Sequence, residues 1–140
     1  MCDILLKMKP ILAFFAKKYI AGTERRHALN VAGTLNRVGI TATIDHLGEN
    51  IKNIKDAESV VDGYASLLDD IKNTGINSNI SIKLTHLGLD LSEEIARKNA
   101  EAIIKKALAL DNSVCFDMEG SAYTKKTIGI CLELHRLYPN

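Results

Sequence analysis

The sequence predicts an α/β fold in which short parallel strands alternate with helices. Three short runs rich in β-branched and apolar residues begin near Gly39, Asn79 and Ser113. The segments between them repeat apolar residues at three- and four-residue steps, which is the period of an amphipathic helix. The spacing from run to run is close to the roughly thirty residues of a βαβ unit, which requires parallel strands joined by right-handed crossovers.

Residues 1–38 are predicted to form a helical segment ahead of the first strand. Lysines and Pro10 interrupt the apolar run over residues 1–22. No uninterrupted apolar stretch in this run therefore reaches the about 20 residues that a helix needs to cross a bilayer. An amphipathic helix fits this run better. It would cover a domain or lie on another surface, which includes peripheral association with a membrane. A second helix follows, with Thr23 as its cap and Gly39 at its end.

Residues 39–140 are predicted to contain three βα units. Gly75 follows the first helix of this region, at the position where a left-handed C-terminal cap is expected. Ser92 is a suitable cap for the next helix, and the final helix extends to about Tyr138. The expected strands lie near residues 39–49, 79–85 and 113–118.

Composition argues against several classes of protein. The net charge is +1 and there is no Trp, so the sequence has no electrostatic or stacking signature of a nucleic-acid-binding protein. The three cysteines show no metal-ligand spacing, which predicts no metal site and a reduced, cytoplasmic protein. Cys115 and Cys131 are interpreted as small buried side chains. No strand is followed by a glycine-rich phosphate loop.

Charged side chains occur at the expected C-terminal ends of all three strands. In a parallel barrel these ends form the active-site face. Two interpretations stay open: the residues are solvated or form structural ion pairs, or they build a site. Burial would make each charge costly unless it is paired or used. The residues are Asp45 and Glu49, then Lys83 and His86, then Asp117 and Glu119.

Four motifs occur in order along residues 19–140: YIAGT, TIDHLGEN, NISIKLTHLGLDL and FDMEGS. Together they resemble the first part of bacterial monofunctional proline dehydrogenase, the flavin enzyme that begins proline catabolism. The resemblance implies a (β/α)8 barrel with FAD on its C-terminal face. It also implies hydride transfer from the ring of L-proline to the flavin, which gives 1-pyrroline-5-carboxylate, and a quinone as the electron acceptor.

The resemblance implies roles for four residues. Lys83 matches a lysine that helps to hold the substrate carboxylate, and a point charge of this kind suits a carboxylate. Asp117 matches the catalytic aspartate near the substrate nitrogen and the flavin. Met118 matches a residue that packs against FAD. Glu49 matches an acid that forms a structural ion pair with an arginine from the end of the barrel.

The chain departs from the family pattern in two respects. His86 stands where the family commonly has glutamine, and we expect it to be a neutral substitution beside the site. A (β/α)8 barrel needs about 250 residues, and this sequence shows three of its strands. We therefore expect a partial barrel, the N-terminal part of the enzyme, from a truncated, split or incomplete gene. A split gene would require a complementing chain with the rest of the barrel.

Two other classes of function stay open. One is a non-catalytic partial barrel that acts as a partner or regulatory protein. The other is a (β/α)8 aldolase with Lys83 as the Schiff base, which requires a depressed lysine pKa. If the family resemblance holds, the chain alone should neither oxidise proline nor hold FAD tightly. Lys83 and Asp117 should then project from the same end of the sheet toward a common side.

Overall fold

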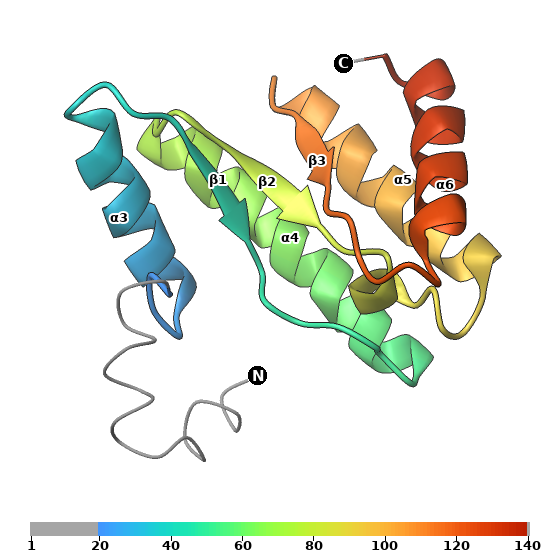
Figure 1. The fold of residues 1–140 in the computed structure, drawn as a ribbon. Helices are drawn as coiled ribbons and strands as arrows, with labels where there is room; N and C mark the ends of the chain where they lie inside the picture. The colour runs from blue at the N-terminus through green and yellow to red at the C-terminus, as the bar shows by residue number, and fades with distance from the viewer. Residues whose placement is uncertain (1–19, 140) are drawn as a thin grey trace.

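The computed structural model describes residues 20–139 of the chain. Its elements alternate as the sequence predicts, from helix α3 through three strand–helix units (Figure 1). The helix expected within residues 1–22 lies outside the described residues, apart from Ile20–Gly22, which are not helical, and so does Cys2. The bounds are α3 Arg25–Asn36, β1 Ala42–Asp45, α4 Ile54–Thr74, β2 Ser78–Ile82, η1 Thr85–Leu87, α5 Glu93–Ala109, β3 Val114–Phe116 and α6 Thr124–Leu137.

The three strands form one parallel sheet in the order β1-β2-β3. Ile44 of β1 is level with Ile80 of β2, which in turn is level with Val114 of β3. Both connections between strands are helical crossovers, because adjacent parallel strands cannot be joined by a tight turn. As a result all three strands end at the same edge of the sheet, as Figure 1 shows.

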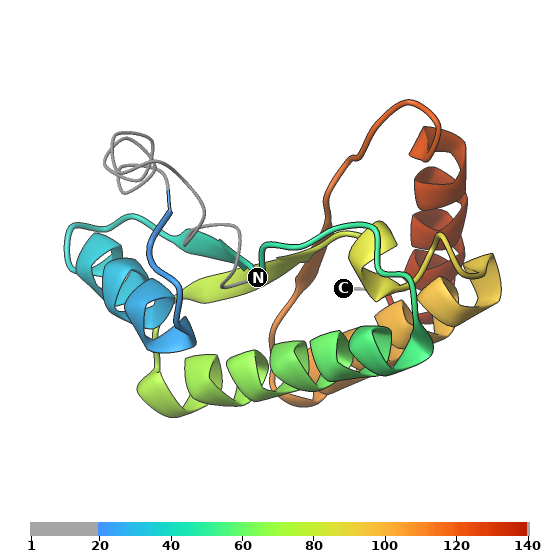
Figure 2. The ribbon, with the colours of Figure 1, turned by 90° about the horizontal axis from the view of Figure 1, so that it is seen from below.

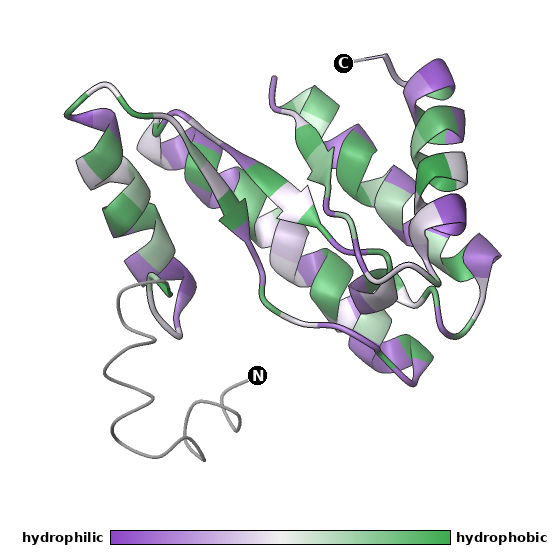
Figure 3. Cartoon of the chain, in the orientation of Figure 1, coloured by the Kyte–Doolittle hydropathy of each residue, from purple (hydrophilic) through white to green (hydrophobic). Residues whose placement is uncertain are grey.

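Helices α4 and α5 pack on one face of the sheet and against each other (Figure 2). Side chains alternate along a strand, so Ile80 and Ile82 face these helices and are completely buried. Figure 3 shows apolar and polar residues alternating around the helices, as expected where one helical face is buried. The core is continuous through Tyr64 and Leu68 of α4 and Ile103 of α5.

The opposite face of the sheet is polar. Thr43 donates a hydrogen bond to Asn79 across β1 and β2, with an oxygen–oxygen distance of 2.6 Å. The Asn79 amide lies 3.3 Å from both Ser113 Oγ and Cys115 Sγ. The expectation that Cys115 is buried is therefore wrong, since Cys115 is exposed on this face while its neighbours in β3 turn toward the helices. Cys131 is partly buried on α6.

The helix ends follow local chemistry. The side chain of Asn53 accepts a hydrogen bond from Asp56 N–H at the start of α4, and Gly75 ends this helix with φ of 67°. Ser92 caps α5 as predicted, accepting from Glu94 N–H at 3.2 Å. The expected cap of α3 is displaced by one residue, because Glu24 rather than Thr23 occupies the capping position. Helix α3 packs on β1 and α4, and the division of the chain at residue 38 stays a prediction.

Leu68→Ala should lower the free energy of unfolding by about 2–5 kcal/mol, because Leu68 is completely buried and the smaller side chain leaves a cavity. Urea denaturation measures the change. Leu132→Ala is the matched control, since Leu132 is 51% exposed on α6 and its truncation should cost less than about 0.5 kcal/mol. Equal losses in the two variants would contradict the described core.

Candidate active site

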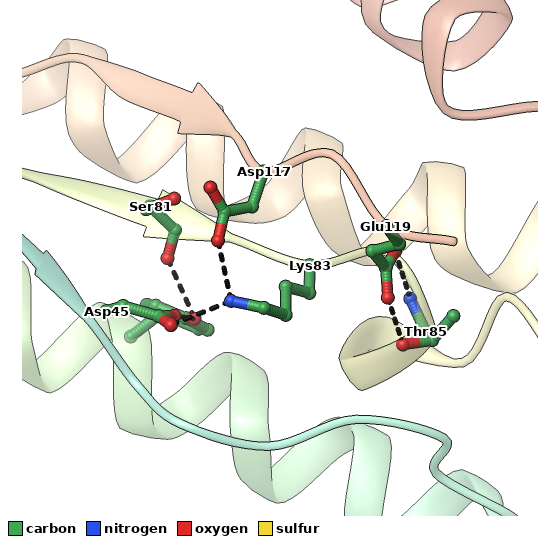
Figure 4. A network of polar contacts seen from close by, with 7 residues as sticks. Asp45, Ser81, Lys83, Thr85, Asp117 and Glu119 are labelled. Carbon is green, nitrogen blue, oxygen red and sulfur yellow. Dashed lines mark hydrogen bonds and ion pairs between the residues drawn. The ribbon is translucent and has the colours of Figure 1, made fainter. Parts of the chain in front are cut away.

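Three strand ends meet at the ammonium group of Lys83. Lys83 directly follows β2, and its Nζ lies 2.8 Å from Asp45 Oδ2 and 2.6 Å from Asp117 Oδ2. Asp45 is the last residue of β1, and Asp117 directly follows β3. Figure 4 shows the lysine side chain extending between the two carboxylates. The expected geometry, with Lys83 and Asp117 on one side of the same end of the sheet, is present.

The Lys83 side chain is 14% exposed, whereas those of Asp45 and Asp117 are 26% and 47% exposed. Burial acts to lower the pKa of the Lys83 ammonium, but its hydrogen bonds to Asp117 and Asp45 together outweigh burial and leave the pKa above its ordinary value. The lysine is therefore protonated at neutral pH. A Schiff-base lysine requires the opposite shift, so the electrostatics do not support the aldolase alternative.

A second cross-link lies next to the ion pairs. The carboxylate of Glu119 accepts hydrogen bonds from the N–H of Thr85, at 3.2 Å, and from the Thr85 hydroxyl. Figure 4 shows this contact on the side of Lys83 away from Asp45. Glu119 was expected at the end of the third strand. Its partner Thr85 was not identified from the sequence, because a threonine after a strand has no pattern that sets it apart.

Tyr64 approaches the site from α4. It is completely buried, and its hydroxyl donates to the carbonyl oxygen of Ser81 at 2.9 Å and lies 3.5 Å from Asp45 Oδ1. Burial, followed by the nearby negative charge of Asp45, raises the pKa of Tyr64, so the phenol stays neutral. The sequence placed Tyr64 on the apolar face of a helix. It gave no signal that the hydroxyl reaches the neighbouring strands.

His86 is buried, with only 5% of its surface exposed, and its ring packs edge-on against His46 at 5.2 Å between centroids. Burial, supported by the neighbouring His46, lowers the pKa of His86 to about 4. The Nδ1 atom of His86 has no hydrogen-bond partner among the described residues. The expectation of a position beside the site agrees with this placement, and the neutrality of the substitution stays a prediction.

The other two predicted site residues lie outside the ion-pair cluster of Asp45, Lys83 and Asp117. Glu49 is exposed in the loop after β1 and forms no salt bridge with any residue of the described chain. Met118 is 55% exposed directly after Asp117. The role of Glu49 as a partner of an arginine and the role of Met118 as a flavin contact stay predictions. No group of three or more His, Cys, Asp or Glu side chains that could hold a metal ion occurs in residues 20–139.

The sequence profile of the proline dehydrogenase family matches residues 28–137. The chain belongs to the proline dehydrogenase family. It is 37% identical over 115 residues to proline dehydrogenase 1 of Bacillus subtilis strain 168, a match that covers 82% of this chain and 38% of the relative. It is 31% identical over 107 residues to proline dehydrogenase of Deinococcus radiodurans, covering 74% of this chain and 34% of the relative.

This proline dehydrogenase family member therefore spans less than half the length of these curated relatives. A crystal structure of proline utilization A from Bdellovibrio bacteriovorus, inactivated by N-propargylglycine, aligns with 89% of the chain at a TM-score of 0.74 and 21% identity. The match covers 16% of that protein. The likeness confirms the expected fold class, a partial (β/α)8 barrel. No helix in residues 20–139 is both long and apolar enough to span a membrane.

Gly48→Ala should destabilise the fold, because the added methyl group would overlap the imidazole ring of His86. Overpacking of this kind costs about 1–3 kcal/mol. The double variant Gly48→Ala/His86→Ala should recover part of the loss, which urea denaturation of a double-mutant cycle measures. Gly129→Ala is the control, since no atom lies within 4 Å of its added methyl group apart from its chain neighbours and the nearby backbone of α6. Strict additivity in the cycle would refute the close approach of Gly48 to His86.

The buried His86 predicts a loss of stability in acid. The unfolded chain takes up this proton near pH 6.5, whereas the folded chain does so near 4. Between these values the unfolded state binds more protons, so the free energy of unfolding falls as the pH is lowered. The ceiling is roughly 3 kcal/mol, at about 1.4 kcal/mol per tenfold change in the ionisation constant.

His86→Gln should reduce this loss, as measured by urea unfolding at pH 7 and at pH 4.5. His46, Asp45 and Lys83 face His86 and are present in both proteins, so their contributions largely cancel in the comparison. His135→Gln, on the exposed side of α6, is the matched control. The same loss in wild type and His86→Gln would show that His86 does not carry the effect.

Proposed function

We propose that this chain supplies part of an active site that oxidises L-proline to 1-pyrroline-5-carboxylate. The observation that carries the proposal is the contact of Lys83 with Asp117 at 2.6 Å, at the strand ends of a chain that belongs to the proline dehydrogenase family. Proline is a zwitterion whose ammonium and carboxylate are adjacent. The internal ion pair offers the complementary charges at a similar separation.

Substrate binding would exchange partners within this cluster. The proline carboxylate takes a place beside Lys83, and the proline ammonium takes a place beside Asp117. Asp117 is the more exposed of the two carboxylates, at 47% against 26% for Asp45. Asp45 therefore keeps its contact with Lys83 and compensates the lysine charge. Hydride leaves the ring carbon that adjoins nitrogen and does not carry the carboxylate, and the nitrogen releases a proton to solvent as the C=N bond forms.

FAD is the cofactor that we propose for this reaction, and it supplies the hydride acceptor. The residues of the cluster fit one part of it. Met118 presents an exposed apolar side chain beside Asp117, which suits contact with a flat ring. The three carboxylates of Asp45, Asp117 and Glu119 outnumber the one ammonium of Lys83, and this charge does not suit a diphosphate. We propose that the diphosphate is held elsewhere, and that a quinone accepts the electrons.

The proposal requires the remainder of a barrel around this chain. A complementing chain or a longer protein would supply it, and peripheral contact with a membrane would bring the quinone within reach. We expect the 140-residue chain alone to bind flavin weakly and to show no turnover. The cytoplasmic location stays a prediction of the sequence.

A chimera tests the proposal. Residues 28–137 of this chain replace the matching segment of the B. subtilis enzyme, and proline-dependent reduction of an artificial electron acceptor is measured together with bound flavin. The chimera should oxidise proline. Lys83→Met should raise KM about tenfold or more, because a hydrogen bond to a charged group is worth about 1.5–3 kcal/mol. Asp117→Ala should lower kcat/KM by at least as much.

Lys105→Met is the matched control, since Lys105 is 57% exposed and pairs with Glu101 within α5. Its kcat and KM should stay within about twofold of the parent chimera, because exposed i,i+4 pairs are worth only about 0.3–0.5 kcal/mol. A chimera that binds flavin but shows no proline turnover would favour the non-catalytic alternative. An unchanged KM in Lys83→Met would remove the substrate role of this lysine.

A further inference from the structure

Thr85 connects three strand-end loops of the molecule. It is the first residue of η1 and is 1% exposed. Its N–H and its hydroxyl both donate to the carboxylate of Glu119, in the loop after β3. Its carbonyl oxygen accepts a hydrogen bond from Ile51 N–H, in the loop after β1, at 3.1 Å. One buried residue therefore joins the segments that follow β1, β2 and β3.

The contact between Thr85 and Glu119 repeats the Lys83–Asp117 pairing two residues further along both segments. Thr85 lies two residues after Lys83, and Glu119 lies two residues after Asp117. The two segments are joined first by the Asp117 N–H bond to Ile82 O at 2.9 Å, then by the Lys83–Asp117 contact, and then by Thr85 and Glu119. The Thr85–Glu119 contact is thus the last of three successive contacts that join the end of β2 and the residues after it to the segment after β3.

The two hydrogen bonds between Thr85 and Glu119 fix the orientation of the Glu119 carboxylate. A carboxylate that accepts from an N–H and an O–H of the same residue is fixed at both oxygens, and hydrogen bonds to an ionised acceptor are about twice as strong as neutral ones. The regular ladder has already ended, because β2 stops at Ile82 and β3 at Phe116. Glu119 therefore continues the connection of the two segments where backbone pairing no longer does.

We propose that Glu119 is a positioning residue, which through Thr85 fixes the placement of Lys83 relative to Asp117. The inference rests on the proposed function, because it concerns the moment when proline separates these two side chains. Their direct contact is then broken. The link between Thr85 and Glu119 is intact and keeps the lysine and the aspartate at a spacing that suits the two charges of the substrate.

Kinetics of the chimera separate positioning from simple stabilisation. Glu119→Gln and Thr85→Val should each lower kcat per bound flavin by about tenfold or more, since misplacing reacting groups by about 1 Å can cost a hundredfold. The fall in kcat should exceed the rise in KM. Thr85→Ser keeps the hydroxyl that Thr85→Val removes, so its kcat should stay close to that of the parent chimera. Glu133→Gln, on the exposed side of α6, is the control.

The double variant Glu119→Gln/Thr85→Val supplies the decisive comparison. When two residues act as one unit, removing the second costs no further activity. The double variant should therefore be no slower than the slower single variant. Multiplicative losses would overturn the proposal. So would single variants that bind less flavin or unfold more easily but keep the parent kcat per bound flavin, which is the behaviour of a purely structural contact.

A measurement on the 140-residue chain is independent of turnover. Amide hydrogen exchange at Asp117 reports on its bond to Ile82 O, one step along the ladder. Glu119→Gln should accelerate this exchange about tenfold or more, and Glu133→Gln should not. Unchanged exchange would overturn the positioning role. A parent chimera without proline turnover, together with accelerated exchange, would refute the proposed function while supporting the mechanical link.

Discussion

The cost of burying the Lys83 ammonium is the constraint on which the site depends. A charge that is largely removed from water must be paired, because an unpaired one would cost several kcal/mol. The two carboxylates that pair with it come from β1 and from the residue after β3, the neighbours of β2 on either side. The charge balance of the site therefore requires the parallel order of the sheet. The sheet and the ion pairs thus meet at the same three strand ends.

The sequence was sufficient for the fold because its local and global signals agree. Gly75 and Ser92 end and begin helices where the hydrophobic period also changes. The failures have physical causes. Cys115 was expected inside because it is apolar and lies in a strand, but alternation along β3 turns it toward the polar face. Thr23 was expected as a cap, yet Glu24 occupies that position without a side-chain bond, and a helix boundary of this kind is difficult to place from sequence.

The site was predictable to the extent that charge is visible in a sequence. Lys83, Asp117, Asp45 and Glu119 stood out because ionised residues follow apolar runs. Tyr64 and Thr85 did not, since tyrosine on an apolar helical face and threonine after a strand are ordinary in a core. The hydroxyl groups of both residues bond to elements far apart in the chain, and the direction of each group depends on the packing between those elements. Pairwise partners across a sheet require the register, which the sequence pattern alone did not give.

The two carboxylates that pair with Lys83 differ in exposure, and this difference distinguishes their two contacts with the lysine. Asp45 is the less exposed and lies near the Tyr64 hydroxyl, whereas Asp117 is about half exposed. In the proposed exchange, an incoming substrate ammonium would therefore meet Asp117 first, and a lysine released from Asp117 would still have Asp45 as its counter-ion. Such an exchange would leave neither the lysine nor the substrate ammonium without a carboxylate partner. A symmetric pair of carboxylates would leave both contacts equally open to replacement, and the substrate would then have no preferred orientation.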